Sequence, residues 1–209
     1  MTHYAEEQFN KWERFYRANV INSLTGFKSV SLIGTANSKG KTNLGIFSSI
    51  VHIGSNPALV GYINRPRKAA PHTLANIEST GVYTINHIQP SFLEKAHQTS
   101  AKYAEEVSEF EAVGLTPEYI NQFPAPFVKE SIVRYALELQ EIIPVKMNDT
   151  FFVIGKINSI QLEENLLQPD GFIDLHKAES VCSNSVDSYY KTIPLSRFAY
   201  AKPNSPTEK

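Results

Sequence analysis

The chain has 209 residues, of which 42% are hydrophobic and 20% are charged, and its formal net charge is −1. This length and composition are typical of a globular protein with one core, and the near-zero charge gives no general attraction to nucleic acid or to an anionic membrane. A single cysteine, Cys182, excludes an internal disulfide framework and a zinc site built from cysteines. Glu6 and Glu7 stand where a signal peptide needs apolar residues, and no apolar run approaches a membrane span, so we expect a cytoplasmic protein.

The first predicted element is an amphipathic helix over residues 3–24. Apolar and aromatic side chains recur at three- and four-residue steps from Phe9 to Val20, which gives the helix one apolar face. Gly26 follows as a stop signal. We expect this helix to cover one end of the core or to pack on a partner subunit.

The stretch from residue 28 to residue 87 is rich in strand-forming residues. The turn signals Asn37 to Gly40 and Asn56-Pro57 divide it. The predicted strands are 28–36, 42–49, 50–54, 58–64 and 82–87. A short helix, 73–79, precedes the last strand, with Thr73 as its N-cap and Gly81 just past its end.

Ser91 predicts the start of a second helix, which ends near Ser100. The following polar segment, 101–126, contains Gly114 and several prolines. A loop-rich excursion of this length inside a compact domain is often a functional lid, and it is equally compatible with packing at a dimer interface.

Residues 131–147 and 150–163 form the clearest predicted hairpin, with Asn148-Asp149 as its turn. Short strand or helix pieces follow over 172–200, and we expect a disordered tail over 203–209.

The chain shows no internal repeat and no linker, so we predict a single domain over residues 1–209, with its barrel at about 28–200. Two groups of strands, 28–87 and 131–163, do not alternate with full-length helices. This pattern favours a mainly β protein, a Greek-key β-barrel with an N-terminal helix and helical and loop insertions, over a doubly wound sheet.

Most familiar catalytic motifs are absent from the sequence. Ser48 and Ser49 lie in no G-x-S-x-G elbow, the histidines lack H-E-x-x-H spacing, and neither a Walker A nor a G-x-G-x-x-G motif is present. What remains is a basic loop in which Arg65 and Lys68 precede the predicted helix start at Thr73. Basic side chains beside a helix N-terminus favour a phosphate, although residue types alone leave a solvated basic turn with an ordinary cap as the alternative.

The same stretch resembles the flavin reductases with an FMN-binding split barrel, in particular their flavoredoxin-like branch. That family carries an N-L-x-x-F-S-S strand, a D/N-P turn, an apolar strand ending near an arginine, and an H-T-x-x-N-I helix start. The corresponding pieces here are NLGIFSS at 43–49, Asn56-Pro57, Arg65 and HTLANI at 72–77. Pro71 before His72 departs from the pattern.

The resemblance implies an FMN-binding oxidoreductase of the flavin reductase type, which passes hydride from NAD(P)H to flavin and on to an acceptor. The acceptor is either a small molecule or a redox partner protein, and the resemblance implies a homodimer with FMN near the subunit interface. The cofactor supplies the chemistry, so no catalytic side chain and no metal ligand is predicted. The predicted cofactor-binding residues are Asn43, Ser48, Ser49, Asn64, Arg65, Lys68, His72 and Thr73.

Residues 98–110 are the predicted cover for the exposed face of the flavin ring. Asn86 and His87, at the end of the adjacent strand, are predicted to be structural. Three other functions remain open: an FMN-binding electron carrier or flavin store without turnover, a barrel oxidase acting on a substrate such as pyridoxamine phosphate, and an interaction module that has lost its cofactor.

Overall fold

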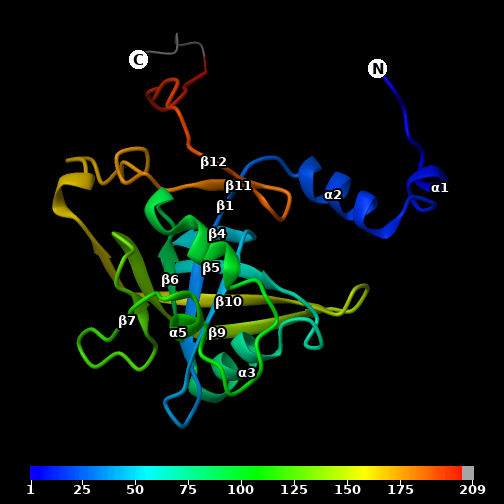
Figure 1. Ribbon diagram of the computed structural model, residues 1–209. Helices are drawn as coiled ribbons and strands as arrows, with labels where there is room; N and C mark the ends of the chain where they lie inside the picture. Colours follow the sequence, from blue (N-terminus) through cyan, green and yellow to red (C-terminus); the bar gives the residue numbers. More distant parts are fainter. Residues whose placement is uncertain (204–209) are drawn as a thin grey trace.

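The computed structural model describes residues 1–203 and is built around one seven-stranded antiparallel sheet (Figure 1). The sheet joins both groups of predicted strands, as the mainly β prediction requires. In spatial order its strands are β3 (Thr42–Phe47), β2 (Ser31–Ala36), β6 (Val82–His87), β9 (Val133–Val145), β10 (Thr150–Leu162), β5 (Ala58–Asn64) and β4 (Ile50–Ser55).

The β9–β10 hairpin is the longest pairing, and the alternation in its sequence predicted it. Its register includes Ile157 opposite Leu137, and the register shifts between Ile154 and Gly155 and again between Ile157 and Ser159. Asp149 adopts φ 57° in the turn, a conformation that short polar side chains tolerate. The predicted strands 58–64 and 82–87 agree with β5 and β6 to the residue.

Two main hydrophobic clusters fill the molecule. One lies inside the curved sheet around Tyr62 and Tyr83, and helix α3 (Pro71–Thr80) closes it with Leu74 and Ile77. The other includes Val30 and Phe110. It draws on helices α4 (Leu93–Gln98) and α5 (Glu109–Val113).

The prediction of one continuous N-terminal helix over residues 3–24 is wrong. The structure has two helices, α1 (Glu6–Phe9) and α2 (Arg14–Leu24), because the Glu13 carboxylate caps α2 by accepting the N–H groups of Phe15 and Tyr16 at 2.8 and 3.0 Å. Neither helix has a buried residue, and the segment extends away from the large sheet (Figure 1). The predicted packing on the core therefore does not occur within one chain.

Two helix starts also differ from prediction. Helix α3 begins at Pro71 with Ala70 as its N-cap, so Thr73 lies inside the first turn, since proline is favoured at the first helical position. Ser91 lies within a 3-10 turn, Pro90–Phe92, and α4 begins after it. The predicted end of α3 is confirmed, because Gly81 takes φ 74° there.

The remaining elements are small. Strand β1 (Lys28–Ser29) pairs with β11 (Cys182–Asn184), which pairs with β12 (Ser188–Tyr190). The segment 101–126 is not irregular throughout, since it contains α5 and β7 (Pro117–Glu118), which pairs with β8 (Phe127–Val128). A second 3-10 turn spans Glu164–Leu166. Residues 204–209 of the predicted tail lie outside the described residues.

Candidate functional site

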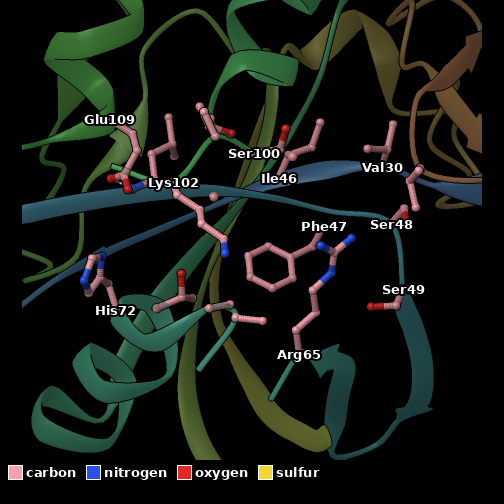
Figure 2. Close-up of a pocket in the computed structure, with 18 of the residues that line it drawn as sticks. Val30, Ile46, Phe47, Ser48, Ser49, Arg65, His72, Ser100, Lys102 and Glu109 are labelled. Atoms are coloured by element: carbon pink, nitrogen blue, oxygen red, sulfur yellow. Dashed lines mark hydrogen bonds between the residues drawn. The ribbon is translucent and has the colours of Figure 1, made fainter. Parts of the chain in front are cut away.

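A pocket of about 460 Å³ opens where the end of β3, the loop after β5 and the start of α3 meet (Figure 2). The segment 99–103 forms a further wall. The pocket gathers seven of the eight predicted cofactor-binding residues in its lining: Asn43, Ser48, Ser49, Arg65, Lys68, His72 and Thr73.

Strand β3 supplies the floor of the pocket. Its last residue, Phe47, places its ring in the middle of the pocket in Figure 2, and the ring packs edge-on against Tyr62 at 5.0 Å between centroids. Gly45 leaves room for this ring, because an added Cβ would lie 3.1 Å from Phe47 Cε2. Asn43 is buried, and its Nδ2 donates to Thr73 Oγ1 at 3.0 Å.

The two predicted serines differ in their free hydrogen-bonding capacity. Ser49 Oγ accepts from Ile63 N and donates to Ile63 O, each at 3.1 Å, so this hydroxyl ties the start of β4 to the end of β5. Ser48 makes no side-chain hydrogen bond within residues 1–203 and stays available to a ligand.

Asn64 is the predicted residue that does not line the pocket. It is fully buried, and its Nδ2 donates to the carbonyl of Arg65 at 2.8 Å and to that of Ala70 at 3.5 Å. Asn64 therefore holds the two ends of the basic loop together, so its position favours a role in shaping the loop.

The basic loop separates two arginines with different surroundings. Arg67 forms an ion pair with Glu78 of α3 and lies over the ring of Phe151, 4.9 Å from its centroid, outside the pocket. Arg65 and Lys68 line the pocket, and neither forms a salt bridge within the described part of the chain. Both charges are therefore free to bind an anion.

The start of α3 opens into the same pocket. Ala70 and Pro71 lie in its wall together with His72 and Thr73. The first N–H groups of a helix have no intrahelical partner, and among residues 1–203 no side chain caps this helix. The helix start therefore carries unsatisfied donors and a partial positive charge toward the pocket.

Two wall residues, Lys102 and Glu109, lie in the predicted cover 98–110 and are not among the predicted cofactor-binding residues. Lys102 points its ammonium group into the pocket in Figure 2. Glu109 is buried, and its Oε2 accepts a hydrogen bond from Leu44 N at 3.0 Å. Burial raises the pKa of the Glu109 carboxyl, and the Leu44 N–H partly offsets this effect. No local pattern marks Glu109, since 65 positions separate it from Leu44.

Residues Asn86 and His87 make structural contacts outside the pocket. The Nδ2 of Asn86 donates to the carbonyl of Leu32 at 3.2 Å, and its Oδ1 accepts from Val128 N at 2.9 Å. His87 Nδ1 lies 3.0 Å from Ser180 Oγ, and burial lowers the pKa of His87 to about 4.

Within residues 1–203, no three or more His, Cys, Asp or Glu side chains gather in a way that could hold a metal ion. In the same part of the chain, none of the helices combines the length and apolar character needed to cross a membrane.

Comparisons with known proteins identify the family. A sequence profile of the flavin reductase-like domain matches residues 26–180. A candidate flavin reductase with a split barrel domain from Shewanella frigidimarina NCIMB 400 superimposes with a TM-score of 0.93, at 49% identity, over 96% of this chain and 100% of that chain.

Two more distant structures show the fold alone. Nitrilotriacetate monooxygenase component B from Bacillus cereus is 18% identical, with a TM-score of 0.83 over 94% of this chain and 98% of that one. Flavoredoxin of Desulfovibrio vulgaris (Miyazaki F) is 24% identical, with a TM-score of 0.71 over 86% and 92%. The predicted split-barrel architecture is confirmed, and the chain belongs to the flavin reductase-like domain family.

Proposed function

We propose that the protein is an FMN-dependent oxidoreductase that uses NAD(P)H as the reductant and delivers the electrons to a small acceptor or a partner protein. The observation that carries this proposal is the uncapped start of α3, which opens into one pocket with the free cations Arg65 and Lys68. Such an arrangement fits a phosphate monoester attached to a larger ligand.

The pocket also fits the remainder of a flavin mononucleotide. Its volume of about 460 Å³ lies in the range of small-molecule sites. Phe47 and Ile46 offer apolar surface to a flat ring, and the free hydroxyl of Ser48 offers a hydrogen bond to the edge of that ring. The pocket thus offers partners for both a phosphate and the polar edge of a ring.

When bound, FMN supplies the group that accepts hydride from a nicotinamide and releases electrons to the acceptor. The residues of the chain bind the cofactor and orient it. Arg65, Lys68 and the start of α3 hold the phosphate, Asn43 positions Thr73 beside it, and the segment 99–103 excludes water from one side of the pocket. We also propose that residues 98–110, which include this segment, cover the exposed face of the flavin ring.

We also propose that the protein acts as a homodimer. The outer face of β4 and β5 exposes Val51, Ile53 and Ile63, and Ile63 also lines the pocket. A second copy of the chain on this face would bury apolar side chains and bring the pocket close to the interface. Light scattering of the purified protein tests this directly, and a monomer at working concentrations would contradict it.

The function is tested by recording the visible spectrum of the purified protein before and after adding FMN, and then adding NADH or NADPH without oxygen. We expect flavin absorption that bleaches with one of the nicotinamides. Bound flavin that stays oxidised with both reductants would favour an electron carrier or store, and failure to bind FMN would overturn the proposal.

A further inference from the structure

One wall of the pocket comes from segments that flank the matched family domain. The domain match covers residues 26–180, whereas α2 and the β11–β12 hairpin also reach the pocket. We call these residues the flanking wall: Asn22 from α2, and Ser183, Ser185, Val186 and Tyr189 from the hairpin.

The flanking wall stands at the end of the pocket near Val30. Strand β1 pairs with β11, with Ser29 opposite Cys182, so Val30 lies next to the start of the hairpin. Figure 2 shows Val30 and Ser48 at the opposite end of the pocket from His72. The flanking wall therefore adjoins the part of the pocket that we assign to the flavin ring.

The flanking wall differs chemically from the rest of the pocket. It contains hydroxyl, amide and apolar groups and no charged side chain, whereas the positive charges of the pocket, Arg65, Lys68 and Lys102, come from other segments of the chain. Neutral hydrogen-bonding groups beside apolar surface suit an uncharged polar ring and add no positive charge that would attract a phosphate.

The buried hydroxyl of Ser183 indicates that the flanking wall binds a ligand. This residue is 2% exposed, and its Oγ has no hydrogen-bond partner among the described residues. A buried hydroxyl without a partner costs about 1–3 kcal/mol, and a ligand atom that bonds to it would recover that energy. Ser183 lines the pocket, so a molecule bound against this wall would lie beside the residue that carries the unpartnered hydroxyl.

The other polar groups of the flanking wall are held in place. The Tyr189 hydroxyl lies 2.6 Å from His97 Nδ1 of α4, and the two rings meet edge-on at 5.6 Å. Burial raises the pKa of Tyr189, and the nearby Asp187 carboxylate raises it further. Ser185 Oγ bonds Asn19 Oδ1 of α2 at 3.4 Å. The wall is thus anchored to two helices.

We propose that the flanking wall is a second subsite, which binds the uncharged ring of the molecule that exchanges electrons with the flavin. This inference rests on the proposed function. The shared chemistry is a flat ring bearing a carboxamide or carbonyl oxygen, which accepts a hydrogen bond from Ser183 Oγ while its faces contact Val30 and Val186. Either the nicotinamide of the reductant or a quinone-like acceptor meets this description.

The test uses the flavin-loaded protein and the double variant Ser183→Ala/Tyr189→Phe. Two probes are titrated by their effect on the flavin spectrum, NAD⁺ for the reductant and menadione for the acceptor, and neither titration needs turnover. We expect about tenfold weaker binding of one probe, the effect of losing one or two neutral hydrogen bonds, with unchanged FMN affinity. The probe that weakens identifies which molecule uses the subsite.

Tyr190→Phe is the matched control. Tyr190 neighbours Tyr189 on β12, does not line the pocket, and packs edge-on against Phe27 at 4.8 Å. We expect it to bind both probes as the wild type does. Unchanged affinity of the double variant for both probes overturns the subsite, and so does a loss confined to FMN affinity. Failure of the wild type to bind FMN overturns the proposed function together with the subsite.

Discussion

Asn43 donates a hydrogen bond from Nδ2 to Thr73 Oγ1 over 3.0 Å, and this bond joins β3 to the first turn of α3 at the wall of the pocket. A similar bond lies one turn further along the helix, where Asn76 Nδ2 donates to Thr35 Oγ1 of β2, also at 3.0 Å. Two Asn–Thr pairs thus fix α3 to the sheet, and only the first pair lines the pocket.

The two pairs allow the cofactor role to be separated from stability. Asn43→Ala should lower the free energy of unfolding by about 1–2 kcal/mol and also weaken FMN binding, because Thr73 loses its anchor beside the phosphate. Asn76→Ala should lower stability by a similar amount and leave FMN affinity unchanged. Urea unfolding and FMN fluorescence titration measure the two effects, and equal FMN affinity in both variants would remove Asn43 from the site.

Arg65→Ala should weaken FMN binding by about 1.5–3 kcal/mol, the size of a lost charge-assisted hydrogen bond. Its guanidinium lines the pocket and has no salt bridge within residues 1–203. Raising the salt concentration should reduce the difference between the variant and the wild type, because salt screens an exposed charge.

The control for Arg65 lies two residues further along the same loop. Arg67 is engaged by Glu78 and by the ring of Phe151, away from the pocket. Arg67→Ala removes the same charge from the loop and should leave FMN affinity within about twofold of the wild type, since the local contribution of a distant exposed charge is small. Equal losses in both variants would mean that the loop acts only through its net charge.

His87 predicts an acid-sensitive fold. Its pKa lies near 6.5 in the unfolded chain, and burial lowers it to about 4 in the folded chain. The unfolded state therefore takes up the proton first as the pH falls, so stability decreases between pH 6.5 and 4 and this contribution is then exhausted. The loss amounts to about 3 kcal/mol.

Urea unfolding at several pH values measures this loss. His87→Gln should flatten the decrease, because glutamine carries no ionisable ring. The exposed His52 provides the control, and His52→Gln should retain the full decrease. The same acid sensitivity in all three proteins would assign it to other groups.

Local patterns were enough to predict the β9–β10 hairpin, β5 and β6, whereas the resemblance to a known family supplied seven residues of the pocket lining. The reason is that these elements follow from alternation and turn residues, and the pocket residues Asn43, Arg65, His72 and Thr73 lie within one continuous stretch of sequence.

The missed features depend on contacts between distant residues. Glu109 accepts a hydrogen bond from Leu44, which is 65 positions away in the sequence, and Tyr189 contacts His97, which is 92 positions away. No periodicity within either segment predicts these contacts. The break in the N-terminal helix is different, since it is local: the Glu13 carboxylate accepts two backbone N–H groups, and a glutamate at that position also fits a helix interior.

The surroundings of Gly155 predict a strong packing constraint in the sheet. A Cβ at this position would lie 2.2 Å from Tyr83 Oη and 3.1 Å from Leu137 Cβ, both in fully buried residues. Gly155→Ala should therefore lower the free energy of unfolding by about 1–3 kcal/mol. Adding Tyr83→Phe should restore part of the lost stability, because this change removes the clashing oxygen. The Tyr83 hydroxyl has no hydrogen-bond partner among the described residues, so its removal breaks no bond there.

Gly54→Ala is the control, since its added Cβ meets only Pro57 O at 3.5 Å. This variant should be nearly neutral in the same thermal or urea unfolding measurements. An equal loss of stability at both glycines would contradict the packing argument.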